Sequence, residues 1–298
     1  MGATSYRIVG LGELLWDMLP SGKQMGGAPA NFAYHAAGFG AQGLIASRVG
    51  EDALGSELRE RVEALGFDTR YIQTDPNHPT GTVNVELDAA GQPDYRIVEH
   101  VAWDYLAFDA SWRTLAGGAD AACFGSLIQR HEVARETVTH FLKATRQDCI
   151  RIFDVNLRQS FFSRSVIEAS LRMSTIVKLN DEEFPRVCGL LGVSEGGVEA
   201  QARRLIEQFE LELVCITRGA AGSILISSSE IDDHPGYRVE VADTVGSGDA
   251  FTAALAHHYL RGARLPRINE AANRLGAWVA SQHGATPTLD EGILEDVL

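Results

Sequence analysis

The stretch "GLIASRVGEDALGSELRERVEALG", residues 43–66, places one strand directly before one helix. Its first eight residues form the short apolar run of a buried strand, and residues 53–66 carry apolar side chains at helical spacing and end on a glycine. Further strands are predicted at 6–12, 121–127, 150–157, 174–180, 212–219 and 222–228. Further helices are predicted at 28–39, 131–147, 163–172, across 181–209, at 249–262 and at 267–283. This alternation predicts a mostly parallel sheet with helices on both faces.

Residues 71–100 break the alternation. Here the apolar period is two, turn residues are frequent, and no helix separates the strands. "TVNVELD" and "DYRIVEH", joined by "AAGQP", predict an antiparallel hairpin. Because such a hairpin does not fit easily into a parallel sheet, we expect a small β-sheet lid that projects from the main domain.

The composition is that of an ordinary globular protein, with 298 residues, 45% hydrophobic and 22% charged. This length suits one large α/β domain, with or without a small appendage, or two domains. A net charge of −14 argues against nucleic-acid and anionic-membrane partners, which require a basic face. No signal peptide or spanning apolar run is present, and the four cysteines show no CxxC spacing. We therefore expect a cytoplasmic protein.

"GFGAQG", residues 38–43, matches the GxGxxG dinucleotide fingerprint but follows a predicted helix and precedes a predicted strand. The fingerprint requires the reverse order, in which the helix N-terminus faces the pyrophosphate. A nicotinamide-dependent oxidoreductase is therefore not favoured. No GxxxxGK[ST], HExxH or CxxC motif is present either.

"DTVGSGDA", residues 243–250, runs from two glycines into an acid at a predicted helix start. Backbone amides of Gly246, Ser247 and Gly248 can point into one concavity, and a helix N-terminus favours an anion there. Asp249 beside such a cradle suits phosphorylation of a hydroxyl, because the carboxylate accepts the proton while the amides stabilise the phosphoryl group. The alternative, a glycine turn with an acidic first helical turn, is equally compatible with this stretch alone.

Two further stretches place polar side chains where a ligand can meet them. "GGAPAN", residues 26–31, offers a close backbone approach and an asparagine at a helix start, and Asp17 precedes it. "FDVNLR", residues 153–158, ends a predicted strand with Asp154, Asn156 and Arg158 at alternating positions, so that all three are expected to face one side. The alternative for "GGAPAN" is an ordinary first turn of a helix.

Two more motifs suit a nucleotide and its metal. "NDEE" brings Asn180 and Glu183 together on one turn, and their oxygens suit a hydrated magnesium ion. "TRGAAG", residues 217–222, is a glycine-containing turn that can cover a nucleotide. An N-capped acidic helix start remains the alternative for "NDEE".

Together, "DTVGSGD" and the early "GGAPAN" make the chain resemble the ribokinase-like family of carbohydrate kinases, which includes fructokinases, ribokinases and 2-keto-3-deoxygluconate kinases. The resemblance covers essentially the whole chain. It implies a single domain over 1–298 with a three-layer α/β/α Rossmann-like fold, and a β-sheet lid formed by about 13–25 and 71–100.

The resemblance also implies roles for individual residues. Asp249 matches the catalytic base, residues 246–248 match the anion hole, and Arg158 adds positive charge near the phosphates. The positions that match sugar contacts are Asp17, Gly27 and Asn31, with the lid pair Tyr95 and Arg96 on the same side. The positions that match nucleotide contacts are Asn180, Thr217, Gly219, Gly222 and Asn273. The positions that match metal contacts are Glu183, for Mg²⁺ through water, and Asp243 with the Val245 carbonyl, for a monovalent cation such as K⁺.

The activity implied is that of an ATP-dependent sugar kinase, which transfers the γ-phosphoryl group to a primary hydroxyl of a small sugar, with fructose the leading candidate. Ala28 stands where ribokinases tend to carry lysine, which disfavours ribose. Arg96 suits a sugar hydroxyl or the carboxylate of 2-keto-3-deoxygluconate, or is simply a solvated lid arginine. A nucleoside kinase and a non-catalytic sugar-sensing protein remain alternatives. The expected partners are the sugar and ATP, and an exposed lid edge invites a homodimer.

Overall fold

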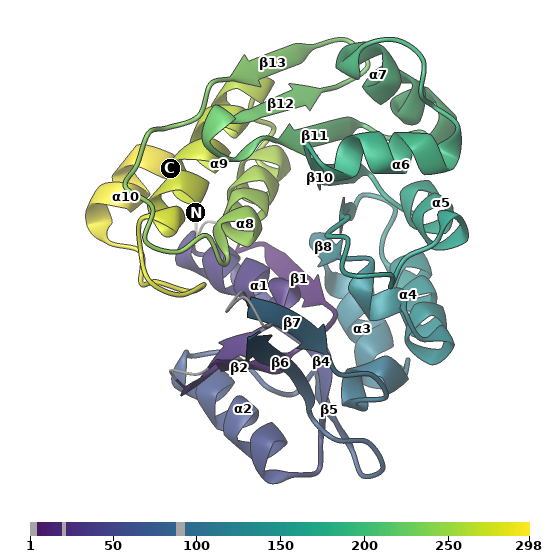
Figure 1. Ribbon diagram of the computed structural model, residues 1–298, viewed down its shortest axis with the longest axis vertical. Coiled ribbons are helices and arrows are strands. Elements are labelled where there is room, and N and C mark those ends of the chain that lie inside the picture. Colours follow the sequence, from purple (N-terminus) through teal and green to yellow (C-terminus); the bar gives the residue numbers. More distant parts are fainter. Residues whose placement is uncertain (1–4, 20–21, 88–92) are drawn as a thin grey trace.

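Short runs rich in branched apolar residues form a nine-stranded sheet (Figure 1). The computed structural model describes residues 5–19, 22–87 and 93–298. The strand order is β13-β12-β11-β10-β9-β8-β1-β4-β5. The strands are β1 (Arg7–Leu11), β4 (Gln42–Gly50), β5 (Ile72–Asp75), β8 (Ala121–Phe124), β9 (Ile150–Asp154), β10 (Ile176–Asn180), β11 (Leu213–Thr217), β12 (Ser223–Ile226) and β13 (Ile231–His234). All neighbours from β5 to β11 pair in parallel, whereas β12 and β13 are antiparallel additions at one edge.

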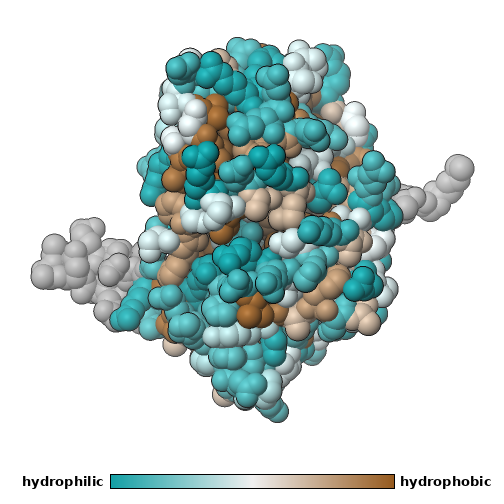
Figure 2. Space-filling view, turned by 90° about the vertical axis from the view of Figure 1, so that its right-hand side faces the viewer, coloured by the Kyte–Doolittle hydropathy of each residue, from teal (hydrophilic) through white to brown (hydrophobic). Residues whose placement is uncertain are grey.

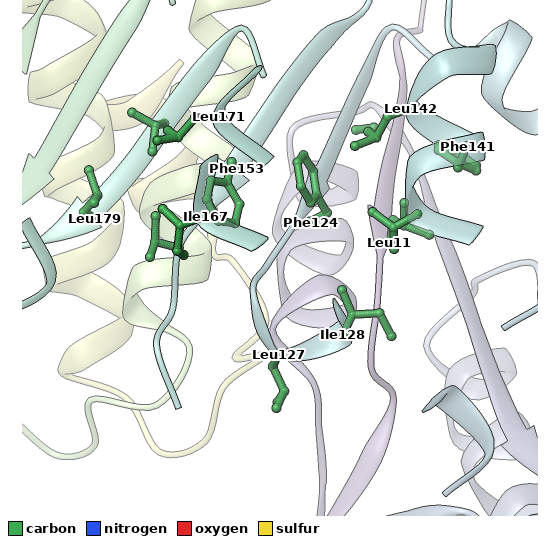
Figure 3. Close-up of a cluster of buried hydrophobic side chains, with 14 of the residues drawn as sticks. Leu11, Phe124, Leu127, Ile128, Phe141, Leu142, Phe153, Ile167, Leu171 and Leu179 are labelled. Atoms are coloured by element: carbon green, nitrogen blue, oxygen red, sulfur yellow. The ribbon is translucent and has the colours of Figure 1, made fainter. Parts of the chain in front are cut away.

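Helices cover both faces of this sheet and divide the core into two main clusters. One cluster packs beneath α3 (Ala110–Gly118), α4 (Glu132–Ala144), α5 (Arg164–Arg172), α6 (Glu183–Leu191) and α7 (Val198–Phe209). The other packs beneath α1 (Ala28–Gly38), α8 (Ser247–Leu260), α9 (Leu265–Ala280) and α10 (Glu291–Val297). Phe124 and Phe153, on adjacent strands, stack with ring centroids 5.2 Å apart in the first cluster (Figure 3). The α/β fold expected from the sequence is confirmed.

A second, four-stranded sheet lies beside the large one, with order β3-β2-β6-β7. Its strands are β2 (Leu15–Leu19), β3 (Gly22–Gly26), β6 (Gly81–Leu87) and β7 (Pro93–Ile97). The β6–β7 pairing is the antiparallel hairpin expected between residues 71 and 100. The range expected for the lid is wrong at its start, because β5 pairs in parallel with β4 in the large sheet. Buried Ile72 anchors it there, in a small core cluster with Leu58 and Val62 of α2 (Ala53–Ala64).

The remaining short helices are η1 (Ala102–Tyr105), η2 (Leu127–Gln129) and η3 (Gly219–Ala221). Among the residues that the structure describes, no helix is both long and apolar enough to cross a membrane. On the face shown in Figure 2, hydrophobic residues lie scattered among hydrophilic ones.

Candidate active site

The candidate site lies at the carboxyl ends of the parallel strands, where open α/β sheets bind ligands. Glu13 follows β1, Arg158 follows β9, Asn180 ends β10 and Thr217 ends β11. The N-terminus of α8 meets the same edge, because Thr252 Oγ1 in its second turn donates a hydrogen bond to Asp154 Oδ2 at 3.0 Å. Residues far apart in the chain thus converge on one end of the sheet.

The glycine turn forms the first turn of α8. Gly246 is the N-cap with φ 79°, a left-handed conformation, and a β-carbon there would lie 2.5 Å from the Ala285 carbonyl oxygen. Ser247 Oγ donates to the Thr244 carbonyl at 2.9 Å, which fixes the incoming loop. The first amides of a helix have no intrahelical acceptor. The Ser247 amide donates to the Thr244 carbonyl at 3.3 Å, and the neighbouring amides of Gly246 and Gly248 can face an anion.

Asp249 is the third residue of α8, and its carboxylate accepts a hydrogen bond from Asn31 Nδ2 at 2.9 Å. Burial and the nearby Asp154 charge raise the pKa of Asp249 to about 7, against the lowering effects of Asn31, Lys178 and Arg158. A carboxylate with a pKa near neutrality is well matched to accept a proton from a hydroxyl. The contact joins the two most specific sequence motifs, 218 residues apart.

Polar groups on α1 and β2 face the same region. Asn31 is buried, and its Oδ1 has no hydrogen-bond partner within the described residues. Gly27 has φ 121°, and a side chain there would overlap the Glu13 carbonyl. The Asp17 carboxylate lies beside Gly26, where any β-carbon would overlap it. Burial raises the pKa of Asp17, and Arg158 lowers it.

Arg158 connects these groups electrostatically. Its guanidinium lowers the pKa values of Glu13, Asp17 and Asp249, so it lies close enough to act on all three. Since Arg158 itself is exposed, its charge is presented at the mouth of the site. The structure therefore brings the predicted base and the predicted sugar contact around one arginine.

The alternation predicted along "FDVNLR" is wrong. β9 ends at Asp154, and Asn156 adopts φ 42°, which turns the chain out of the strand conformation. Asp154 and Asn156 nevertheless line one small cavity, and Arg158 lies nearby for the reason given above. The turn, and not a shared strand face, brings them to the site.

Lys178, in the middle of β10, was not indicated by the sequence patterns. Its Nζ lies 2.9 Å from Asp154 Oδ2, and both side chains are buried. Burial lowers the pKa of Lys178, but the Asp154 carboxylate outweighs this and holds the amine charged. A β-carbon on Gly248 would lie 3.1 Å from this Nζ. A fixed positive charge thus lies directly behind the glycine turn.

Asn180 and Glu183 contact each other as expected. Asn180 Oδ1 accepts from the Glu183 amide at 2.7 Å, and Glu183 accepts from the Asn180 amide at 2.9 Å and from the Leu157 amide at 2.7 Å. The pair therefore clamps the loop after β9 to the start of α6. Within the part of the chain that the structure describes, no three His, Cys, Asp or Glu side chains are grouped to hold a metal ion.

A separate cavity of about 480 Å³ adjoins the glycine turn. Its lining includes four of the five predicted nucleotide contacts, Thr217, Gly219, Gly222 and Asn273. It also includes residues that no sequence pattern indicated, among them Tyr237, Val239, Val241, Phe251 and Ala277. Ser247 and Gly248 also line it, so the cavity reaches the glycine turn.

For the other predicted contacts, the structure gives the surroundings of each described residue separately. Asn180 is not among the residues that line this cavity. Asn273 Nδ2 donates to Ser223 Oγ at 2.8 Å, so its amide supports the cavity wall. The Asp243 carboxylate accepts from the amides of Val245 at 3.0 Å and Gly284 at 3.2 Å. Arg96 is exposed, and the Tyr95 side chain lies outside what the structure describes.

Glu13 is a site residue that the sequence analysis missed. It is only 4% exposed, and its Oε2 has no hydrogen-bond partner within the described ranges. Burial, and to a smaller extent Asp249, raise the pKa of Glu13 to about 7. The one available signal was an acid directly after a buried strand, inside the apolar run "IVGLGELLW".

Residues 20–291 match the model of the pfkB family carbohydrate kinases. An uncharacterized sugar kinase of Pyrococcus horikoshii is 32% identical over 306 residues, covering 95% of this chain and 94% of that protein. A fructokinase of Klebsiella pneumoniae is 28% identical over 82% of this chain and 81% of its own length. A fructokinase of Escherichia coli is 26% identical over 96% of both chains.

Solved structures share the fold. That of the Pyrococcus horikoshii sugar kinase in complex with ATP matches with a TM-score of 0.82 and 31% identity, covering 98% of this chain and 99% of that one. A Xylella fastidiosa fructokinase with bound ATP matches with a TM-score of 0.83 and 22% identity, over 98% and 97% of the two chains.

Proposed function

Since the chain belongs to the pfkB family of carbohydrate kinases, we propose that it transfers the γ-phosphoryl group of ATP to a primary hydroxyl of a small sugar, with fructose the leading candidate. One observation carries the proposal: the start of α8 borders both the large cavity and the region that contains Asn31 and Asp17. Ser247 and Gly248 line the large cavity, whereas Asp249 contacts Asn31 on the side of Asp17. A phosphate on one side of this turn would face a hydroxyl on the other.

In the proposed reaction, Asp249 accepts the proton of the sugar hydroxyl as its oxygen attacks the γ-phosphorus. The amides of 246–248 stabilise the charge on the transferring group. Arg158 adds positive charge at the open side, and Lys178 adds it from behind Gly248. Closure of the small sheet over the sugar excludes water, which otherwise competes as the acceptor.

The nucleotide is proposed to occupy the 480 Å³ cavity, in contact with Thr217, Gly219 and Gly222 and with Asn273 in the wall behind it. Bound Mg²⁺ supplies charge neutralisation at the phosphates. Both carboxylate oxygens of Glu183 already accept backbone amides, but each retains a further lone pair, so they fit the water shell of the ion. Asn180 positions Glu183 for this contact.

A monovalent cation such as K⁺ is proposed near Asp243 and the Val245 carbonyl. The Asp243 carboxylate already joins two loops beside the glycine turn, and its oxygens keep acceptor capacity for a cation.

Support for fructose comes from relatives named fructokinase at 26–28% identity. Asp17, Gly27 and Asn31 are proposed to contact its hydroxyls, with Tyr95 and Arg96 from β7. An acid sugar such as 2-keto-3-deoxygluconate is the second candidate, because exposed Arg158 and Arg96 suit its carboxylate. Ribose and nucleosides follow. A sensing protein without catalysis is not favoured, since the carboxylate, the glycine turn and the cavity are all in place.

We place this reaction in the cytoplasm, where the four buried free cysteines would stay reduced. The outer strands β3 and β7 of the small sheet are suited to pairing with a second copy of the chain.

The test is a coupled assay of ADP release with fructose, 2-keto-3-deoxygluconate, ribose and nucleosides, repeated with Asp249→Asn. We expect turnover with fructose and a loss of about 10²- to 10⁴-fold in kcat for the variant, because the base is removed. Asp148→Asn, at an exposed aspartate, is the matched control and should turn over like the wild type. Turnover of no acceptor, or full activity of Asp249→Asn, would contradict the proposal.

A further inference from the structure

A small cavity lies between Glu13 and Asp249, separate from the large nucleotide cavity. Its volume is about 10 Å³, roughly the space that one water molecule occupies. Asp154 and Asn156 are its other polar lining residues, and the rest of the wall is mostly apolar, as at Phe32. Glu13, nearly fully buried, contributes to this wall a carboxyl whose Oε2 has no partner among the described residues.

The charges around this cavity cannot all be satisfied at once. Asp249 faces it from α8, and Asp154 from β9, where Lys178 of β10 already neutralises Asp154. Cys123 of β8 also lines it, and burial holds the pKa of that thiol high, so it stays neutral. Arg158 supplies further positive charge, but it also acts on Asp17 on β2. Two ionised carboxyls, on Glu13 and Asp249, therefore face too little positive charge.

The two carboxyls differ in what stabilises a negative charge. Asp249 accepts the Asn31 amide and lies in the first turn of α8, where the helix dipole favours an anion. Glu13 has backbone amides near one oxygen, but its Oε2 receives no hydrogen bond. A proton shared by the pair is therefore held more strongly on Glu13.

We propose that Glu13 is a positioning residue of the phosphoryl transfer, which holds a proton on Oε2 at neutral pH and thereby leaves Asp249 as the ionised base. This rests on the proposed kinase function. In each turnover the hydroxyl proton passes to Asp249, the sugar oxygen bonds to the γ-phosphorus, and the bond to the ADP oxygen breaks. The proton leaves to solvent on product release.

The electrostatics of the two carboxyls agree with this arrangement. Burial raises the pKa of each to about 7, Asp249 further raises that of Glu13, and Asp154 further raises that of Asp249. Interacting groups of this kind release their protons in two steps that belong to the pair. The first release activates Asp249. The second ionises Glu13 and places a second negative charge where the phosphoryl group must arrive.

The test is the pH profile of kcat/KM, from pH 5 to 9, for wild type and Glu13→Gln. The glutamine imitates a protonated glutamate, so we expect activity within about threefold of wild type at pH 6.5 and an unchanged acid limb. The wild type should lose about tenfold above the second ionisation, and the variant should not. An acid limb that moves down by about one pH unit would show that Glu13 is an ionised neighbour, and would overturn the proposal. So would two identical profiles. Exposed Glu295→Gln is the matched control.

Thermal unfolding provides a readout that needs no substrate. Glu13 has a folded pKa above its unfolded value, so its contribution to stability is present below about pH 4.5 and is lost as the pH rises through about 7. The melting temperature of wild type should therefore fall more steeply between pH 5 and 8 than that of Glu13→Gln. Equal slopes of melting temperature against pH would overturn the proposal that Glu13 holds a proton. A difference in slope without turnover of any sugar would contradict only the kinase proposal.

Discussion

At the scale of single residues, the buried ion pair of Lys178 and Asp154 determines the charge behind the glycine turn. Asp154 also accepts from Thr252, so its carboxylate is held by both β10 and α8. A buried pair of this kind is costly to break, because one charge is left without a partner in a region of low dielectric constant. The two residues are thus coupled in stability as well as in position.

Lys178→Met should lower the free energy of unfolding by about 3 to 5 kcal/mol, because Asp154 would remain as an unpaired buried charge. The double variant Lys178→Met with Asp154→Leu should recover at least half of that loss. Urea unfolding measures both variants. A double variant no more stable than the single one would contradict the coupling.

Single residues were also the scale at which the sequence was least informative. Asp249 and Asn31 stand in motifs whose spacing indicates their role, whereas Glu13 and Lys178 are lone charges inside apolar strand regions. A lone charge in such a run is explained only by the partner that the fold supplies. For Lys178 that partner is Asp154, whereas Glu13 is explained by burial and by the nearby acid Asp249, and both neighbours are distant in the chain.

At the scale of elements, the start of α8 depends on a turn that only glycine accommodates. Gly246 combines a left-handed backbone with the close approach of Ala285. Gly262, after the end of the same helix, has φ 68°, but a β-carbon added there would meet nothing within 4 Å. A substitution at Gly262 would therefore cause backbone strain alone, whereas one at Gly246 would cause both backbone strain and steric overlap.

Gly262→Ala should destabilise the protein by about 1 to 2 kcal/mol through strain alone and leave kcat unchanged. Gly246→Ala should cost more than this, because the loop at Ala285 must also move, and should lower kcat at least tenfold by displacing the turn that holds Asp249. Urea unfolding and the ADP-release assay provide the two measurements. Equal effects of both substitutions on kcat would contradict this account of the turn.

Most strands and helices were predicted from their apolar period. The exceptions have physical reasons. β5 has only four residues and is held in the large sheet by its pairing with β4 and by buried Ile72. The alternation after Asp154 failed because Asn156 takes a positive φ, which no pattern of side chains announces. The short helices α3 and α10 provide too few turns for a clear period.

At the scale of the whole molecule, the proposed nucleotide cavity is assembled from three distant parts of the chain. The turn after β11, the segment from Gly236 to Phe251, and the face of α9 from Asn273 to Ala280 form its wall together. Ligand bound there would stabilise the folded state as a whole, since the unfolded chain has no such wall.

ADP at about 100 times its Kd should therefore add about 2.7 kcal/mol to the free energy of unfolding, which appears as a rise in melting temperature of several degrees. Ala277→Phe should remove this rise by filling the cavity. Val133→Phe, at an exposed position on α4, is the matched control and should keep it. If ADP raised the melting temperature of the Ala277→Phe variant as much as that of the wild type, the nucleotide would have to bind elsewhere.

The sequence by itself determined the alternation of strands and helices, the position of the glycine turn and the identity of its acid, because these depend on local period and on backbone freedom. Only the tertiary structure decided what surrounds that acid. Asn31, Arg158, Lys178 and Glu13 reach Asp249 from four separate segments, and burial then raises the pKa values of both carboxyls toward neutrality. Electrostatic interactions depend on distance and desolvation in space, which separation along the chain does not encode.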